Sequence, residues 1–284
     1  MFLNEPRISV ALRATLAGSE FSVNSSCRRR LRRQAPWRVI INPQAKPLAE
    51  VLTPHAQAKV AEEWRRRVVA EYGSAGVTHS LLGWLLRLGA SPTLLHEGVR
   101  IIDDELVHAE MAFAVLCEAG ENAASVHLGA GLLGLAPDPA HTLLEQVCVH
   151  GVRTFCLGET VAVRLFKRLR EGATVDSARR ALDRVLTDEV RHRDFGWLLL
   201  EWLAQRPEWP ALAQLIRTRL PDWLRDLYDS YAPEGPSAAF DPALRAWGLM
   251  PPDEYRAALL ETIERGYVPR FAEYGIDAQA ALDS

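Results

Sequence analysis

The chain has 284 residues, of which 48% are hydrophobic and 24% charged, and this composition is typical of an ordinary soluble globular protein. Its net charge is only −3, and it has no apolar run of 18 or more residues, which excludes a membrane-spanning helix. The four cysteines form no Cys-x-x-Cys pair, which favours reduced thiols and a cytoplasmic location over a disulfide framework.

Residues 1–52 lack a long helical period and form a basic N-terminal extension. They hold nine basic and three acidic residues, so their net charge is +6 while that of the remainder is about −9. The arginine-rich run from Arg28 to Arg33 predicts a poorly ordered, solvated segment, and contact with nucleic acid or an anionic surface is the alternative. The extension lacks the apolar stretch of a secretory signal.

Four long helices are predicted between residues 53 and 205. The first begins at Thr53-Pro54 and ends near Leu88, and the second begins at Ser91-Pro92 and ends near Glu118, because Thr or Ser before Pro is a typical helix start. A stretch rich in Gly, Ala and Pro, from 120 to 139, predicts a long crossover. The third helix spans about 140–170 and the fourth about 176–204.

Two local features of these helices carry further expectations. Gly73 and Gly76 predict a distortion of the first helix. Most arginines of the fourth helix, including Arg184 and Arg191, are expected on its solvent face.

Residues 206–284 predict shorter helices separated by Pro-rich turns. The predicted ranges are 210–219, 221–231 and 252–267. This part is rich in Trp and Tyr, which predicts packing against the preceding helices. A lid over a substrate or a dimer surface is the alternative.

A short motif occurs twice, as Asp104–His108 (DELVH) and Asp188–His192 (DEVRH). On a helix, a Glu and a His three residues apart lie on one face, so each motif offers a carboxylate and an imidazole in the same direction. Two exposed surface pairs are the alternative. With only eight histidines in the chain, chance is a poor explanation for the repetition. The doubled motif therefore predicts two halves of one metal site.

A di-metal site in a four-helix bundle also needs one inward Glu from each of the other two helices. Glu159 lies in an apolar stripe before the second motif, and Glu71 lies at a similar distance before the first. Glu62 and Glu63 compete with Glu71, but the arginines beside them predict a solvated face. Four carboxylates in a low-dielectric core would carry a charge of −4, which two divalent cations would balance.

This set of residues resembles that of the ferritin-like di-iron carboxylate superfamily, over roughly residues 55–205. The resemblance implies an all-α fold in which 53–205 form a ferritin-like four-helix bundle with a long crossover between helices two and three. Residues 206–284 would form a helical extension packed on it. The implied metal ligands are Glu71, Glu105, His108, Glu159, Glu189 and His192.

The family also implies partners for the two histidines. In such proteins an Asp before a ligand Glu binds the His of the opposite helix, so Asp188 is expected to pair with His108 and Asp104 with His192. The alternative is that both are exposed acids. The implied cofactor is a pair of Fe ions, or a Mn/Fe pair, with O2 as co-substrate.

Departures from better-known relatives narrow the implied reaction. Ala112 stands where a ribonucleotide-reductase-like radical site has Tyr, Ala162 where rubrerythrin-like peroxidases carry Glu, and Val185 where arylamine N-oxygenases carry His. The resemblance then implies an oxidoreductase that uses O2 to hydroxylate, desaturate or N-oxidise a small organic substrate. An external electron donor and a homodimer are both compatible with this function. The alternatives are a ferroxidase or peroxide-scavenging metal-handling protein, and a tRNA-modifying di-iron hydroxylase. Neither nucleic acid nor a membrane is otherwise expected as a partner.

Overall fold

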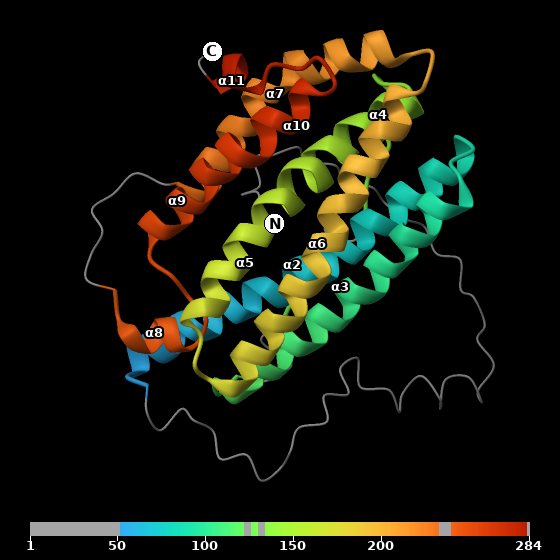
Figure 1. Cartoon of the computed structure of the whole chain (residues 1–284). Helices are drawn as coiled ribbons and strands as arrows, with labels where there is room; N and C mark the ends of the chain where they lie inside the picture. The colour runs from blue at the N-terminus through green and yellow to red at the C-terminus, as the bar shows by residue number, and fades with distance from the viewer. Residues whose placement is uncertain (1–51, 122–125, 130–133, 233–239, 283–284) are drawn as a thin grey trace, which may run out of the picture.

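The computed structural model describes residues 52–121, 126–129, 134–232 and 240–282, and the regular elements in these ranges are all helical (Figure 1). The expectation of an all-α fold is therefore confirmed for these ranges. The predicted basic extension lies outside them, except for Leu52. None of the helices in the described ranges is both long and apolar enough to span a membrane.

The elements follow one another with short connections, apart from the segments between α3 and α4 and between α7 and α8. In chain order they are α2 (Pro54–Arg87), α3 (Pro92–Glu118), α4 (Leu143–His150), the π-helix η4 (Gly151–Glu159), α5 (Thr160–Gly172), α6 (Asp176–Ala204), α7 (Trp209–Tyr231), α8 (Pro242–Ala246), α9 (Pro252–Thr262), the π-helix η5 (Ile263–Tyr267), α10 (Val268–Ala272) and α11 (Ala278–Leu282).

Helices α2 and α3 form a hairpin, and both begin where the sequence predicts. The hydroxyl of Thr53 accepts a hydrogen bond from the N–H of Ala56, and that of Ser91 accepts one from Leu94. Gly89 has a φ of 73°, which allows the tight turn between the helices. The expected distortion at Gly73 and Gly76 is absent, because α2 runs as one α-helix through both.

The predicted third helix is one continuous helical segment made of α4, η4 and α5. Thr142 caps its start through a capping box with Glu145. Its middle, η4, departs from the expected α-helix, since nine residues adopt the wider π-helical form. The residue pattern of 143–172 predicts an ordinary α-helix and gives no sign of this departure.

Helix α6 approaches η4 very closely at Gly196. A Cβ atom on Gly196 would lie only 2.6 Å from the carbonyl carbon of Phe155 and 2.8 Å from the N atom of Cys156. The thiol of Cys156 donates to the Gly196 carbonyl oxygen at 3.2 Å, and the rings of Phe155 and Phe195 meet edge to face. Backbone therefore packs on backbone here, which fixes the position of η4 against α6.

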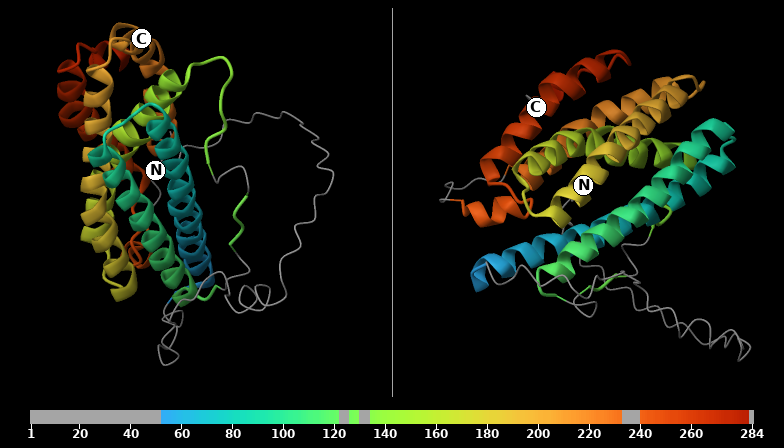
Figure 2. Two further views of the ribbon diagram at one scale, coloured as in Figure 1. Left: turned by 90° about the vertical axis from the view of Figure 1, so that its right-hand side faces the viewer. Right: turned by 60° about the horizontal axis from the view of Figure 1, so that its bottom comes forward.

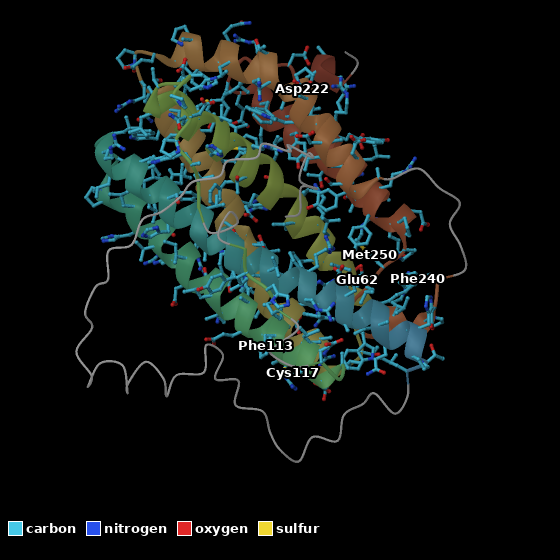
Figure 3. The ribbon with its side chains drawn as sticks, turned by 180° about the vertical axis from the view of Figure 1, so that it is seen from behind. Glu62, Phe113, Cys117, Asp222, Phe240 and Met250 are labelled. Carbon is cyan, nitrogen blue, oxygen red and sulfur yellow. The ribbon has the colours of Figure 1, made fainter. Side chains whose placement is uncertain are left out.

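The helices lie in three layers (Figure 2). The α2–α3 hairpin packs on α6 through α3, α6 packs on η4 and α5, and α7 and α9 contact the α4–α5 segment. Phe240 and Met250 flank α8 and mark the place where this short helix meets α2 (Figure 3). The centre of the molecule is thus enclosed by α2, α3, η4 and α6.

The prediction of two separate helices at 210–219 and 221–231 is wrong. Helix α7 continues through Pro221, although a proline inside a helix usually costs about 3 kcal/mol. Its apolar face does not break at this residue, because Ile216, Leu220, Trp223 and Leu227 are all buried. Burial on both sides of Pro221 keeps the helix in one piece.

Candidate metal centre

Six acidic and histidine side chains meet in the interior, although they come from four different elements. Each is at most 1% exposed. They are Glu71 on α2, Glu105 and His108 on α3, Glu159 at the end of η4, and Glu189 and His192 on α6. The structure therefore brings together all six residues that the sequence analysis selected.

The donor atoms form two groups that share one carboxylate. Atoms of Glu71, Glu105 and His108 lie within 4.8 Å of one another, and so do atoms of Glu105, Glu159 and His192. Glu189 adjoins the second group. Because Glu105 belongs to both groups, it can contact two cations at once.

Each imidazole turns its Nδ1 atom towards the carboxylates. The Nδ1 atom of His108 lies 3.5 Å from Glu71 Oε2 and 3.7 Å from Glu105 Oε2. The Nδ1 atom of His192 lies 3.4 Å from Glu105 Oε1 and 3.7 Å from Glu189 Oε2. With metal–ligand bonds of about 2.1 Å, neighbouring donors around one cation stand about 3.0 to 3.5 Å apart. The observed spacing is close to that range.

Most of these donor atoms have no hydrogen-bond partner among the described residues. The unpartnered atoms are Oε2 of Glu71, Oε2 of Glu105, both carboxylate oxygens of Glu159, both of Glu189, and Nδ1 of His108 and of His192. A buried polar group without a partner is costly, and a native structure rarely gathers several in one place. Cations coordinated by these atoms would remove that cost, so the residues present fit a metal centre.

The outer nitrogens of the two histidines bind the aspartates that precede the two glutamates. His108 Nε2 lies 3.0 Å from Asp188 Oδ2, and His192 Nε2 lies 3.4 Å from Asp104 Oδ2. Each contact joins α3 to α6, as expected from the sequence. Because Nε2 is engaged outside, Nδ1 is presented to the centre.

Arg184 and Arg191 are partly exposed on α6, in agreement with the expected solvent face, and they also cover these aspartates. Arg184 Nη2 donates to Asp104 at 3.1 Å, and its Nε also binds Asp188. Arg191 donates to Asp104 through Nη1 and to Asp188 at 3.3 Å through Nη2. Their side chains are 42% and 36% exposed. The spacing of three and four residues around Asp188 could have revealed these contacts.

Ser74 is a further residue of the site that was not predicted from the sequence. Its hydroxyl donates to Glu105 Oε1 at 2.8 Å. Ser74 follows Glu71 by three residues on α2, so the same helical spacing that links each Glu to its His could have found it. The bond leaves Oε2 of Glu105 as the oxygen without a partner.

The four carboxylates do not share one electrostatic environment. Burial raises the pKa of Glu105 to about 8, against the lowering effect of His108. Burial and the charge of Glu159 raise the pKa of Glu189 well above its usual range. Burial acts on Glu71 in the same direction, but contact with His108 lowers its pKa below the usual value. The protein's own groups therefore do not stabilise Glu105 and Glu189 as anions, and a cation would.

On the outer side of the centre, the contacts between the histidines and the aspartates favour the charged form of both groups. Burial lowers the pKa of His108 and His192, but the hydrogen bonds to Asp188 and Asp104 raise both above the usual value. Burial alone would raise the pKa of the two aspartates, but their hydrogen bonds to the histidines and the nearby arginines lower both pKa values below the usual range. Both aspartates are therefore ionised and hold the imidazoles firmly.

Among the described residues, no thiolate belongs to the centre. Burial raises the pKa of Cys148 to about 12 and that of Cys156 well above its usual value, so neither is ionised near neutral pH. Carboxylate and imidazole donors suit Fe, Mn and similar ions better than metals that prefer sulfur.

Comparison with models of known protein families gives no match to this chain, and comparison with curated proteins gives none either. The case for a metal centre therefore rests on its own geometry. That geometry comprises the burial of six donors, the sharing of Glu105 and the unpartnered atoms that face one another.

Proposed function

We propose that this chain is a ferritin-like di-iron carboxylate protein that uses O2 to oxidise a small organic substrate. Residues 53–205 would form the four-helix bundle, with the crossover between α3 and α4, and residues 206–284 would pack on it. The observation that carries the proposal is the set of eight buried donor atoms, one of them on Glu105, that have no hydrogen-bond partner in the described part of the chain. Four carboxylates would balance the charge of two divalent cations.

Each half of the centre has a defined set of residues to hold one cation. Glu71 and His108 would bind the first cation, Glu159, Glu189 and His192 would bind the second, and Glu105 would contact both. Carboxylate and imidazole ligands with open positions suit Fe(II) or Mn(II). An iron pair held by these residues would supply the two electrons needed to activate O2.

The chain's own groups prepare the centre for this task. Asp188 and Asp104 orient the two imidazoles, and Ser74 fixes one oxygen of Glu105. The apolar side chains next to Glu159 in the chain, including Leu157 and Val161, are fully buried, which limits the access of bulk water to this carboxylate. Exclusion of water strengthens every electrostatic interaction of the site.

The direct test is to measure metal content and reactivity with O2. We expect about two irons per chain after anaerobic loading with Fe(II), as for other sites of this ligand set, and a transient visible absorption on rapid mixing with O2. Glu105→Ala and Glu189→Ala should abolish tight binding of the metal pair, because each removes a buried donor. Glu110→Ala, on the exposed side of α3, is the matched control and should keep both metals.

The result can contradict the proposal in three ways. Full metal content in Glu105→Ala or Glu189→Ala would refute the ligand assignment. One metal or none in the unaltered protein, with no reaction towards O2, would refute a di-iron oxidase. Oxidation of many Fe(II) ions per chain without any organic compound would identify a ferroxidase instead.

A further inference from the structure

The C-terminal helices reach the backbone of η4 through one tyrosine. Tyr267 lies in the second π-helix, η5, and its side chain is fully buried. Its hydroxyl donates a hydrogen bond to the carbonyl oxygen of Leu157 at 2.6 Å. Leu157 precedes the proposed ligand Glu159 by only two residues. A residue that is 110 positions away in the chain therefore contacts the backbone next to the metal centre.

The backbone hydrogen bonding changes at this place. The N–H of Thr160 donates to the same carbonyl of Leu157, three residues before it, instead of the four residues typical of an α-helix. The wide turns of η4 thus end in a tighter turn, and Glu159 lies inside it. Both carboxylate oxygens of Glu159 lack a hydrogen-bond partner within the described ranges. Because no other side chain directs this carboxylate, its direction depends on the backbone of the turn.

The other end of the turn is also held by residues from distant elements. The Thr160 hydroxyl accepts a hydrogen bond at 3.0 Å from Nε1 of Trp197 on α6. The methyl carbon of Thr160 lies so close to Gly266 of η5 that a Cβ atom on this glycine would stand 3.2 Å away. Helix η5 therefore contacts both ends of the turn that carries Glu159.

The C-terminal helices have other contacts that attach them to the bundle. Glu261 of α9 binds Arg164 at 3.0 Å and Arg168 at 3.1 Å, both on α5. Arg168 also donates to the carbonyl oxygen of Glu254 at 3.1 Å. These contacts join α9 to the side chains of α5. The hydrogen bond of Tyr267 differs from them because it reaches the backbone of η4 itself.

We propose that Tyr267 is a positioning residue of the metal centre, whose hydrogen bond to Leu157 keeps the end of η4 in the form that directs Glu159 towards the second cation. The inference rests on the proposed function, because it gives Tyr267 a part in binding one of the two metals. It also gives the C-terminal helices a role beyond covering the bundle.

The test is a stepwise titration of the full chain with Mn(II), comparing Tyr267→Phe with the unaltered protein. The substitution removes one hydroxyl and keeps the ring. The binding event to which Glu159 contributes should weaken about 5- to 10-fold, the scale of one buried hydrogen bond, while the other event stays unchanged. Glu159→Ala shows which event this is, because it removes a ligand of that event alone.

The double variant separates positioning from a general loss of stability. If Tyr267 acts through Glu159, its effect disappears once Glu159 is removed. The event that remains in Glu159→Ala should therefore keep the same affinity when Tyr267→Phe is added. A merely structural role would lower the midpoint of urea unfolding without distinguishing the two metal-binding events.

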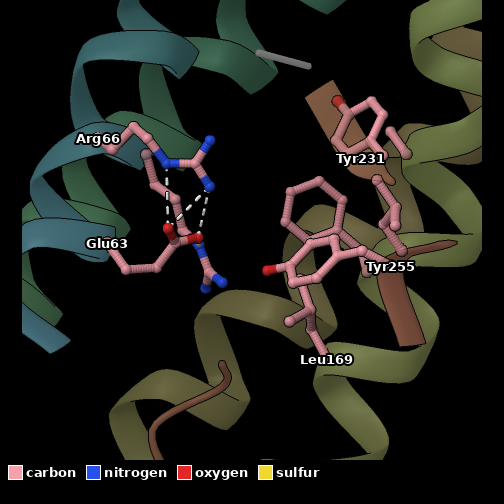
Figure 4. A pocket seen from close by; sticks show the side chains of 9 residues that line it. Glu63, Arg66, Leu169, Tyr231 and Tyr255 are labelled. Carbon is pink, nitrogen blue, oxygen red and sulfur yellow. Dashed lines mark hydrogen bonds and ion pairs between the residues drawn. The ribbon is translucent and has the colours of Figure 1, made fainter. Parts of the chain in front are cut away.

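Tyr255 of α9 provides the matched control. Its side chain lines a pocket between α2, α5 and the C-terminal helices, where its hydroxyl points towards Glu63 and Arg66 and not towards η4 (Figure 4). Glu63 is only 14% exposed there, contrary to the solvated face expected from the sequence. Tyr255→Phe makes the same chemical change in the same group of helices, and it should leave both metal-binding events unchanged.

Amide hydrogen exchange tests the same hydrogen bond without any metal. In chelator-treated protein, exchange at residues 157–162 should become about 5-fold faster in Tyr267→Phe, because one hydrogen bond fewer holds this turn. Tyr255→Phe should not change the exchange of these residues.

Two sets of results would overturn the inference while the proposed function stands. The first is unchanged metal affinity in Tyr267→Phe when the unaltered protein binds two metals. The second is equal weakening of both events, or the same weakening in Tyr255→Phe, since the hydroxyl would then support only the fold. Absence of metal from the unaltered protein would instead refute the proposed function and with it the metal-binding role of Tyr267. The exchange rates of the chelator-treated chain would show separately whether Tyr267 holds the end of η4.

Discussion

The α2–α3 half of the centre and the η4–α6 half carry similar side chains on differently built helices. In the first half Glu71 and Glu105 lie on unbroken α-helices, and Ser74 donates to Glu105. In the second half Glu159 ends a nine-residue π-helix. All four carboxylate oxygens of Glu159 and Glu189 lack a hydrogen-bond partner within the described ranges.

The difference shows how much each half depends on a cation. Contact with His108 lowers the pKa of Glu71, whereas burial and a neighbouring carboxylate raise that of Glu189. Contacts within the protein therefore stabilise the negative charge of Glu71 in the first half. In the second half the protein does not stabilise the negative charge of Glu189, and a bound cation would. We expect loss of metal to affect the η4–α6 half more strongly.

The largest effect should come from substituting the two aspartates that orient the histidines, one for each half. Asp188→Asn removes the charge that orients His108, and Asp104→Asn does the same for His192. Each should weaken one of the two metal-binding events by about 10- to 100-fold, the usual scale for such outer contacts. Stepwise titration with Mn(II) measures both events. Asp194→Asn, on the exposed side of α6, is the control. Unchanged affinities in both variants would show that the aspartates do not support the site.

A smaller effect is expected from the close contact of Gly196 with η4, which belongs to the second half alone. Gly196→Ala would push a methyl group into the backbone of Phe155 and Cys156, and such overpacking typically costs about 1 to 3 kcal/mol. The displacement should also loosen metal binding at Glu159, which can be followed by the same titration. Gly83→Ala is the matched control, because a Cβ there meets nothing within 4 Å, and it should be neutral or slightly stabilising. Equal stability of the two variants in urea would contradict the close approach.

A third effect is a pH dependence of the metal-free protein. The pKa values of Glu105, Glu189 and both histidines are raised on folding. A raised pKa stabilises the folded protein below the unfolded pKa, about 4.3 for Glu and 6.5 for His, and this gain is lost as pH rises through the folded value. The melting temperature of chelator-treated protein should therefore fall between pH 5 and pH 9.

Two substitutions test whether the buried acids cause this dependence. Glu189→Gln should reduce the slope, because it removes a group whose pKa is raised. Glu110→Gln, on the exposed side of α3, is the control and should leave the slope unchanged. A melting temperature that is constant or rises from pH 5 to pH 9 would contradict the assigned shifts.

The parts of the fold that could be predicted are those that depend on neighbouring residues. Thr53 and Ser91, each followed by Pro, set the starts of α2 and α3, and the spacing of three residues placed each His beside its Glu. The inward orientation of Glu159 followed from the apolar residues around it. Such signals are local, so the sequence contains them directly.

The parts that could not be predicted depend on distant contacts. The π-helical form of η4 is accompanied by packing against Gly196, 40 residues after Cys156. The arginines near Glu63 predict a solvated face, but Arg67 is buried and donates a hydrogen bond to the carbonyl oxygen of Gly248, 181 residues later. The composition of a helix and its hydrophobic period do not show which other helix packs on each of its faces.

The π-helix η4 makes the number of residues in its helix as important as their identity. A π-helix completes each turn with more residues than an α-helix, which has 3.6 residues and turns about 100° per residue. Relaxation of this segment to the α form would rotate the residues before it against those after it. Glu159 stands at its end, so the loss or gain of one residue between Gly151 and Glu159 would turn this carboxylate away from the centre without changing any ligand. The direction of the Glu159 carboxylate therefore depends on the length of η4 as well as on the residues in it.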